Sequence, residues 1–239
     1  MNEPLNNYTS FSRNDLEVKP SELPANALIR QQSFLGRIIK RSGDIIFSGA
    51  VITLGFPIFL LLAFFVKVSS PGPIFYTQKR IGRNYTRFGC IKFRTMYKDS
   101  DSLLEDILAN SSQLREEFES DFKLRKDPRI TPIGNFLRRS SLDELPQFFN
   151  VLRGEMSVVG PRPIVKDELD RYGLSMDEVI SVRPGLTGLW QVSGRNNLSY
   201  KKRVQLDLVY ARKRNFLLDL EIIILTLGVL IFPMDRGAF

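Results

Sequence analysis

The run IIFSGAVITLGFPIFLLLAFFV, residues Ile45 to Val66, decides the fold of this chain because it holds 22 consecutive residues without a charge. As a straight α-helix it would be roughly 33 Å long, which matches the hydrocarbon thickness of a bilayer. A secretory signal peptide does not fit, because 44 residues precede the run and no Ala-x-Ala type cleavage site follows it. The run therefore predicts a membrane helix.

Two features favour a re-entrant helix-break-helix over a helix that crosses the bilayer. Pro57 has no N–H to bond the Thr53 carbonyl, and with Gly55 just before it we expect the helix to break near its middle. Each half would then be ~14 Å long, about half a bilayer.

Basic residues also flank the run at both ends, namely Arg37, Lys40 and Arg41 before it and Lys67, Lys79, Arg80 and Arg83 after it. The positive-inside rule then places both ends in the cytoplasm. Because membrane helices tolerate proline, a single span stays open as the alternative.

The composition limits the chemistry that the chain can perform. Lys and Arg number 34 against 26 Asp and Glu, which gives a net charge of +8 and a pI near 9.7. Such a surface attracts phosphates, nucleic acid or anionic lipid head groups, and charge alone does not choose among them. The absence of histidine excludes a Ser-His-Asp triad and imidazole metal sites, and the single cysteine, Cys90, excludes an intrachain disulfide.

The flanking segments predict a tail and a hairpin. Residues 1–32 are polar without a helical or strand period, so we expect a mobile tail before the membrane helix at 33–68. In the compact domain expected at 69–239, a β-hairpin should place Gly82 to Asn84 in its turn. Lys92 and Arg94 lie two apart in the second strand and should share one face, where charge alone favours a solvated surface.

Helices and loops are expected to alternate after the hairpin. Residues 99–126 are acidic and favour helix, which suggests an exposed excursion. A short helix is expected at Ile133 to Arg139, and a second from SSLDELPQFFN (residues 140–150) to about Arg153, with Gly154 as its C-terminal cap.

Two stretches rich in Pro and Gly, residues 157–164 and 182–196, are typical of binding loops. The last uncharged run, Ile222 to Pro233, has 12 residues and is too short to cross a bilayer as a helix. We therefore expect it to lie in the membrane interface or to pack on the core.

The adjacent acids Asp143 and Glu144 have two interpretations. Ser141-x-x-Glu144 fits a capping box, with Ser141 as the N-cap and Glu144 reaching back to it. Alternatively the acids are catalytic, because a helix N-terminus favours ionised carboxylates and bound phosphate, and Arg138 lies just upstream. In either case they should lie in the first turn of a helix, since Pro146 is tolerated only near a helix start.

Four motifs in order carry a resemblance to a known family: PGPIFYTQKRIGRN, KFRTM, SLDELPQFFNVLRGEMSVVGPRP and RPGLTGLWQVSGRN. Together they resemble the small monotopic phosphoglycosyl transferases, the bacterial sugar transferase family that primes glycan assembly on polyprenyl phosphate. The resemblance covers about residues 36–232. It implies a monotopic enzyme on the cytoplasmic face of the bacterial plasma (inner) membrane, in contact with membrane lipids. Such an enzyme transfers a sugar-1-phosphate from a UDP-sugar to undecaprenyl phosphate and releases UMP.

The resemblance further implies a covalent aspartyl-phosphosugar intermediate. Asp143 matches the family's nucleophile and Glu144 its dyad partner, and both are expected to hold the Mg²⁺ that the family uses. A hard cation suits this site, because it offsets the repulsion between a carboxylate and a diphosphate. The basic residues that match family positions around the phosphates and the nucleotide are Lys92, Arg138, Arg162 and Arg195. Pro57 matches the kink of the family's re-entrant helix, although members often carry Ser where this chain has Phe56.

We accordingly expect an α+β, mainly helical fold, with a re-entrant membrane helix and a compact cytoplasmic catalytic domain that contains a small β-hairpin and amphipathic interfacial helices. The expected role is the first membrane step of exopolysaccharide, capsule or O-antigen assembly. The alternative is a non-catalytic basic membrane scaffold that binds anionic lipid. No nucleic-acid partner is expected, because the basic residues form neither a basic helix nor an aromatic stacking platform. Glycoside hydrolysis fits poorly, because its two acids must face each other across the bond, whereas adjacent helical acids point in different directions. A homo-oligomer is compatible with the sequence.

Overall fold

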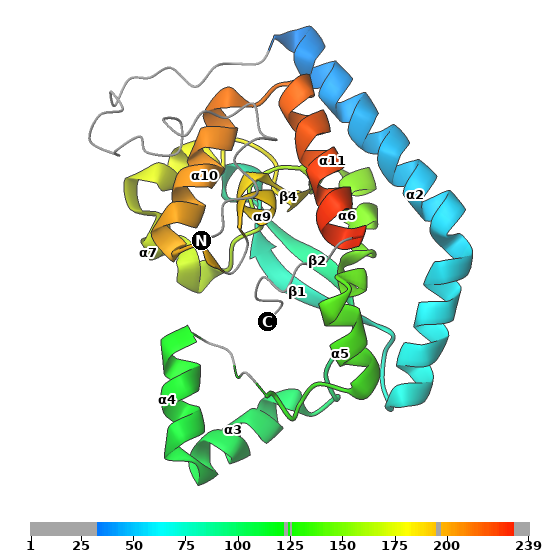
Figure 1. The fold of residues 1–239 in the computed structure, drawn as a ribbon, viewed down its shortest axis with the longest axis vertical. Coiled ribbons are helices and arrows are strands. Elements are labelled where there is room, and N and C mark those ends of the chain that lie inside the picture. Colours follow the sequence, from blue (N-terminus) through cyan, green and yellow to red (C-terminus); the bar gives the residue numbers. More distant parts are fainter. Residues whose placement is uncertain (1–32, 122–123, 125, 195–196, 232–239) are drawn as a thin grey trace, which may run out of the picture.

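The computed structural model describes residues 33–121, 124, 126–194 and 197–231, so the tail expected at 1–32 lies outside the described residues. The protein is mainly helical, with two small sheets at its centre (Figure 1). The long helix α2 (Phe34–Ser69) runs along one side of the body, and α10 (Tyr200–Lys213) and α11 (Phe216–Ile231) lie on another. The mainly helical fold class is confirmed.

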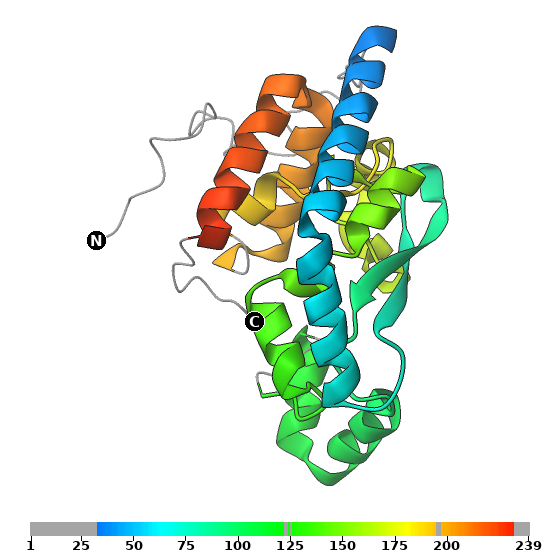
Figure 2. The same ribbon diagram turned by 90° about the vertical axis from the view of Figure 1, so that its right-hand side faces the viewer.

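Helix α2 runs through Pro57 as one helix that bends along its course (Figure 1), so the two separate half-helices that were expected are not present, whereas the re-entrant placement stays a prediction. The N-cap of α2 is Ser33, whose hydroxyl accepts a hydrogen bond from the Gly36 N–H at 3.1 Å. Proline removes one hydrogen bond from the helical ladder, and packing against the body compensates for that loss. Figure 2 shows α2 lying along the length of the body. Within the described part of the chain it is the one helix long and apolar enough to cross a membrane.

Polar contacts fasten the first half of α2 to the body. The Arg41 guanidinium donates to the carbonyls of Val151 and Leu152 at 2.6 and 2.9 Å. The buried Asp44 carboxylate accepts from the Val158 N–H at 3.0 Å and also lies 3.1 Å from Lys40 Nζ. In the second half, Phe59, Leu62 and Val66 enter an apolar cluster with Phe93 and Leu137. The helix is therefore held against one body along most of its length.

The predicted hairpin is confirmed. Strands β1 (Phe75–Ile81) and β2 (Arg87–Phe93) pair antiparallel, with Gln78 opposite Cys90 and Tyr76 opposite Lys92. The short helical turn η2 (Arg83–Tyr85) joins them, and Asn84 has a φ of 51°, a conformation that asparagine tolerates better than most residues. The turn was therefore placed correctly from its Gly and Asn residues.

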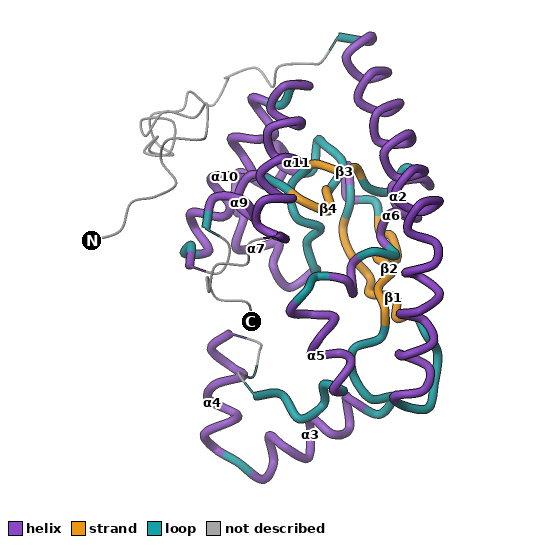
Figure 3. The backbone as a smooth tube through the Cα atoms, turned by 45° about the vertical axis from the view of Figure 1, so that its right-hand side comes forward, coloured by secondary structure: helices purple, strands orange, loops and turns teal. Residues whose placement is uncertain are grey.

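A second sheet lies in the stretches that were predicted to be loops. Strands β3 (Ser157–Val159) and β4 (Gly185–Thr187) pair in parallel at the centre of the molecule (Figure 3). Their backbones approach so closely that a Cβ on Gly185 would lie 2.1 Å from the Gly160 nitrogen. The loop prediction is wrong here, because strands of three residues are too short to show a period of two.

The predicted helical segments are present, although several are shorter than expected. The excursion consists of α3 (Ser100–Asn110) and α4 (Ser112–Asp121), which project from one end of the body (Figure 1). The elements that follow are α5 (Pro132–Arg139), η3 (Leu142–Glu144), α6 (Gln147–Arg153), η4 (Lys166–Glu168), α7 (Leu169–Tyr172), η5 (Gly173–Ser175), α8 (Met176–Val179) and α9 (Leu189–Ser193). Gly154 caps α6 with a φ of 82°, as predicted.

Helix α11 packs on the core, which confirms one of the two expectations for the C-terminal run, and it also exposes an apolar face. Leu218 and Ile222 are buried in the central cluster with Trp190 and Tyr210. The exposed large apolar residues of α11 are Phe216, Leu217, Leu220, Ile224 and Leu227. A surface helix of a water-soluble protein seldom exposes so continuous an apolar face, so this side is suited to lipid or to a partner.

The side chain of Asn150 joins α6 to the edge of β2. Its Oδ1 accepts from the Ile91 N–H at 3.0 Å, and its Nδ2 donates to the Gly89 carbonyl at 2.7 Å. Nδ2 also donates to Glu155 at 2.7 Å, and Asn150 is fully buried. The amide therefore satisfies backbone groups of β2 as a neighbouring strand would. It fixes β2, which carries Lys92, against α6, which follows the acid pair.

Candidate active site

The acid pair lies on the 3-10 turn η3, which precedes α6 instead of forming its first turn. Ser141 has a left-handed φ of 57° and makes no side-chain cap, so the capping-box interpretation is wrong. The Glu144 carboxylate instead accepts a hydrogen bond from Lys92 Nζ at 2.6 Å. A charged partner on β2 is the stronger attraction for this side chain, and the acids are thereby turned toward the hairpin.

Lys92 connects both acids. Its Nζ lies 2.6 Å from Glu144 Oε1 and 3.8 Å from Asp143 Oδ2. The expectation that Lys92 and Arg94 form a solvated strand face is wrong for both residues. The Arg94 side chain is buried and donates to the carbonyls of Val66 and Ser70 at the end of α2.

Burial and charge act differently on the two acids. Burial raises the pKa of Asp143 to about 6, and the attraction of Lys92 only partly offsets this effect. Burial also opposes ionisation of Glu144, but Lys92, Arg162 and Arg80 together hold its pKa below the ordinary value. Near pH 7, Glu144 is therefore ionised, and Asp143 is an ionised carboxylate that is more basic than an ordinary aspartate, which favours it as a nucleophile.

Arg138 stands near Asp143 at the end of α5. Its Nε donates to the hydroxyl of Thr95 at 2.9 Å. Its positive charge lowers the pKa of Asp143, although less than Lys92 does, while burial lowers the pKa of the Arg138 guanidinium itself. Arg138 is therefore a cation whose charge acts on the buried acid.

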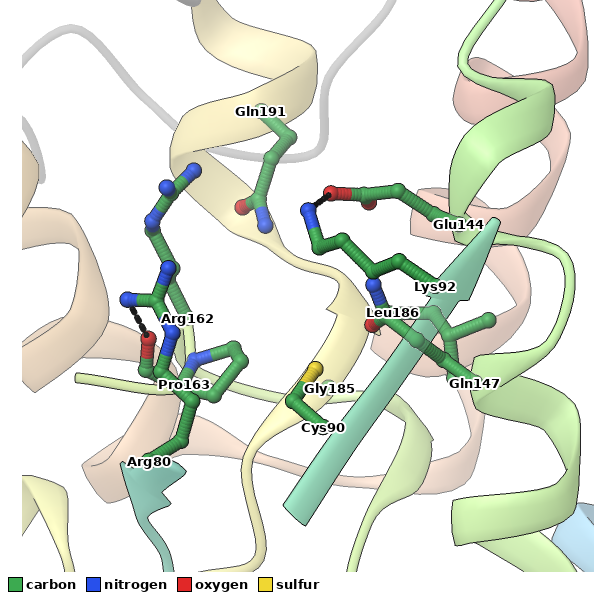
Figure 4. Close-up of a pocket in the computed structure, with 10 residues that line it drawn as sticks. All are labelled: Arg80, Cys90, Lys92, Glu144, Gln147, Arg162, Pro163, Gly185, Leu186 and Gln191. Carbon is green, nitrogen blue, oxygen red and sulfur yellow. Dashed lines mark hydrogen bonds and ion pairs between the residues drawn. The ribbon is translucent and has the colours of Figure 1, made fainter. Parts of the chain in front are cut away.

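A pocket opens beside the acid pair (Figure 4). Its lining residues are Arg80, Cys90, Lys92, Glu144, Gln147, Arg162, Pro163, Gly185, Leu186 and Gln191. Lys92 and Glu144 stand on one side and Arg80 and Arg162 on the other, with Gln191 between them. Asp143 and Arg138 are not among the lining residues, and Lys92 connects Asp143 to the pocket.

The two arginines on the cationic side of the pocket, Arg80 and Arg162, are held by contacts with residues that follow β3 and β4. Arg80 donates to the Pro163 carbonyl at 3.1 Å and lies 3.8 Å from Glu168. The Arg162 guanidinium carbon lies 5.9 Å from the centre of the Trp190 ring, within cation–π range. The three cations Arg80, Lys92 and Arg162 and the ionised Glu144 thus line a space that suits the phosphates of a diphosphate.

Comparison with known proteins identifies the chain's relatives. The sequence model of the family described as "Bacterial sugar transferase" matches residues 35–233. The chain belongs to this family. It is 46% identical over 195 residues to the "UDP-galactose-lipid carrier transferase" of Erwinia amylovora, which covers 82% of this chain and 41% of that protein. It is 44% identical over 205 residues to the "Exopolysaccharide production protein ExoY" of Sinorhizobium fredii, which covers 86% of this chain and 90% of that protein.

A third relative is the "Undecaprenyl-phosphate galactose phosphotransferase" of Salmonella typhimurium, 46% identical over 195 residues. That match covers 82% of this chain and 41% of the relative. The chain thus spans less than half the length of several sugar transferases that it matches, and nearly all of ExoY. Family membership confirms the resemblance that the four motifs carry.

Within this chain, the structure brings most of the expected site residues together. Asp143, Glu144 and Lys92 form one cluster, Arg138 lies near it, and Arg162 lines the pocket. Arg195 lies outside the described residues.

Sequence reasoning missed Arg80, Gln147 and Gln191 as lining residues of the pocket. For Arg80 a signal was present: with Gln78 opposite Cys90, the alternation of the hairpin places Arg80, Cys90 and Lys92 on one face. The two glutamines come from α6 and α9, and no local pattern indicates that these helices meet at the pocket.

Asp207 of α10 is expected to make the stability of this protein depend on pH. Burial raises its pKa to about 8, and a hydrogen bond from Tyr172 Oη at 3.0 Å only partly offsets the effect. Because the unfolded value is near 3.9, the folded state keeps the proton, and the stabilisation it brings is lost as the pH rises from about 4 to 8. We expect the melting temperature of Asp207→Asn to rise relative to that of the native protein over this range. If the difference in melting temperature between Asp207→Asn and the native protein were the same at pH 5 and pH 8, the assignment would be contradicted.

Proposed function

We propose that this protein transfers a sugar-1-phosphate from a UDP-sugar to undecaprenyl phosphate and releases UMP, as the first membrane step of exopolysaccharide, capsule or O-antigen assembly. The names of its relatives support these substrates, since they include a UDP-galactose-lipid carrier transferase and an undecaprenyl-phosphate galactose phosphotransferase. The observation that carries the proposal is the Lys92 ammonium between the two acids, at 2.6 and 3.8 Å, beside a pocket lined by Arg80 and Arg162.

The reaction has two displacements at one phosphorus. The Asp143 carboxylate attacks the sugar-bearing phosphorus of the donor, a carboxylate–phosphorus bond forms, and the bond to the bridging oxygen breaks so that UMP leaves with that oxygen. An oxygen of undecaprenyl phosphate then attacks the same phosphorus and releases the Asp143 carboxylate. The product is a sugar diphosphate of undecaprenol. Splitting the transfer in this way is covalent catalysis by a carboxylate, for which the buried, basic Asp143 is suited.

The basic residues have separate roles in this proposal. Arg80 and Arg162 bind the donor's diphosphate in the pocket. Lys92 lies near Asp143 and stabilises the negative charge on the phosphate once the carboxylate has bonded to phosphorus and lost its own charge. Arg138 supplies a further positive charge near Asp143. Arg195 also binds phosphate in this proposal, as the resemblance to the family implies.

The carboxylates also suit a Mg²⁺ ion. Among the described residues no cluster of three or more metal-ligating side chains occurs. Mg²⁺, however, usually takes one or two carboxylates together with substrate phosphates and water, so Asp143 and Glu144 are a sufficient protein donor set. Bound there, Mg²⁺ would offset the negative charge of the diphosphate.

The surface of α2 and α11 supports a monotopic location on the cytoplasmic face of the plasma membrane. The buried residues of α2 extend from Asp44 to Val66, a length of roughly 33 Å along the helix. One body contacts α2 over that distance, which a helix crossing the bilayer would not allow, because its ends would be separated by lipid. The outward side of α2 and the exposed face of α11 are both rich in Leu, Ile and Phe. We therefore propose a re-entrant placement without an interrupted helix.

Cysteine labelling tests this topology. Leu35 and Val68 stand near the two ends of α2 and are 64% and 68% exposed, so single cysteines there form a matched pair in a background where the buried Cys90 is replaced by serine. Both positions should react with a membrane-impermeant maleimide in inside-out vesicles and be protected in right-side-out vesicles. Labelling from opposite sides would contradict the monotopic placement.

The activity itself is tested by UMP release. Detergent-solubilised protein with undecaprenyl phosphate and Mg²⁺ should release UMP from at least one member of a panel of UDP-sugars, and omission of the Mg²⁺ or of the acceptor should stop turnover. A protein that binds anionic vesicles but releases no UMP from any donor would instead support the non-catalytic scaffold.

A further inference from the structure

Thr95 makes a contact to the catalytic region that the proposed reaction does not yet use. It belongs to KFRTM, two residues after the end of β2, and it is buried. Its hydroxyl accepts the hydrogen bond from Arg138 Nε at 2.9 Å. Within the described residues this is the one hydrogen bond that the Arg138 side chain makes. The two terminal nitrogens of Arg138 are therefore left for a ligand.

The backbone around Thr95 is held in place by α5. The Thr95 carbonyl accepts from the Thr131 N–H at 3.0 Å, directly before that helix. Gly134 packs so closely on the same carbonyl that a Cβ there would lie 2.0 Å from the oxygen. Arg138 follows Gly134 by four residues and thus lies on the same face of α5, one turn further on. The packing of α5 on the Thr95 backbone therefore fixes both Thr95 and Arg138.

The hydroxyl of Thr95 brings no negative charge to Arg138. Asp127 is the other acid near Arg138, but its carboxylate is already engaged by Arg129, whose Nε and Nη2 lie 2.8 and 2.6 Å away. A hydroxyl accepts the Nε hydrogen bond without neutralising the guanidinium. Arg138 therefore keeps its full charge for Asp143 and for the phosphate that reacts there.

We propose that Thr95 is a positioning residue for catalysis: its hydroxyl holds the Arg138 guanidinium beside Asp143 with the terminal nitrogens free for the substrate's phosphate oxygens. This role rests on the proposed function. It predicts that Thr95 acts through Arg138 and chiefly in the transition state, since a guanidinium that can rotate still attracts the donor but no longer meets the developing charge in one fixed place.

The kinetic test compares a matched pair of variants. Thr95→Val keeps the shape but removes the hydroxyl, and we expect kcat for UMP release to fall by about 10- to 100-fold, while KM for the UDP-sugar changes by no more than about threefold. Thr95→Ser keeps the hydroxyl and should stay within about threefold of the native kcat. Melting temperatures of both variants show whether they are folded. A valine variant that is folded and fully active would overturn the proposal, as would a serine variant as slow as the valine variant.

A double variant separates positioning from general support of the fold. If Thr95 acts through Arg138, adding Thr95→Val to Arg138→Gln should lower kcat no further. A loss that multiplies in full would show that Thr95 acts independently of Arg138, and would overturn the proposal.

Hydrogen exchange at Arg138 Nε tests the Thr95–Arg138 contact without substrate, and therefore independently of the proposed reaction. The ¹⁵N-bound Nε proton of Arg138, assigned by its loss in Arg138→Lys, should exchange slowly with water in the native protein and in Thr95→Ser, and rapidly in Thr95→Val. If the native protein releases no UMP from any UDP-sugar, the proposed function fails while this readout still judges the contact. Equal exchange in all three proteins would overturn the role of Thr95.

Discussion

Replacing Asp143 with asparagine is expected to lower kcat for UMP release by roughly 10⁴-fold or more, because the amide has no anionic oxygen to attack the phosphorus. The fold should not suffer. Burial raises the pKa of Asp143 to about 6 against an ordinary value of 3.8, so its ionised form is disfavoured in the folded protein. Above pH 6 the neutral asparagine should therefore leave the melting temperature equal or higher. Steady-state kinetics and thermal unfolding at pH 8 measure the two effects.

The matching control is Glu144→Gln, the same change one residue further along the turn. Glu144 pairs with Lys92 at 2.6 Å, so its loss releases that lysine but leaves the nucleophile in place. A smaller decrease, of roughly 10²-fold, is expected. If Asp143→Asn kept full turnover, or if the two variants exchanged their effects, Asp143 could not be the nucleophile.

The largest expected effect on stability is that of Asn150→Asp. This change replaces the Nδ2 donor, which binds the Gly89 carbonyl and Glu155 at 2.7 Å each, with an oxygen that can only repel them. The Gly89 carbonyl would be left buried without its partner, and a carboxylate would face another carboxylate. We expect the free energy of unfolding to fall by about 3 kcal/mol or more. Activity should fall too, since β2 would no longer hold Lys92 against the acids.

Asn135→Asp supplies the control for chemical denaturation. It makes the same change at an exposed position of α5, where a shift within about 0.5 kcal/mol is expected. Equal denaturation midpoints for both variants would mean that the Asn150 amide does not hold β2 to α6.

Strong local signals explain which parts of the fold could be predicted from the sequence. The charge-free run specified a long apolar helix, and Gly82 and Asn84 marked the hairpin turn. The continuity of α2 through Pro57 depends on packing against residues far along the chain, which local propensity does not contain. The pairing of β3 with β4 likewise depends on the close approach of Gly160 and Gly185, 25 residues apart.

The site divides in the same way. The motifs indicated Asp143, Glu144 and Lys92, and the structure joins them through one ammonium group. The capping box failed because a capping pattern describes only four neighbouring residues, while Lys92, 52 positions away, bonds the Glu144 side chain instead. Thr95 could not be recognised as a contact of Arg138, since only the docking of α5 brings the two together.

The central claim is that Asp143 becomes covalently bound to the phosphosugar, and peptide mass spectrometry tests it most directly. Native protein incubated with Mg²⁺ and a UDP-sugar that it turns over, but without undecaprenyl phosphate, should gain the mass of one hexose phosphate on the peptide that contains Asp143. The adduct should disappear when undecaprenyl phosphate is added, and it should be absent from Asp143→Asn. An adduct on another residue, or full turnover with acceptor but no adduct at any time without it, would contradict the account.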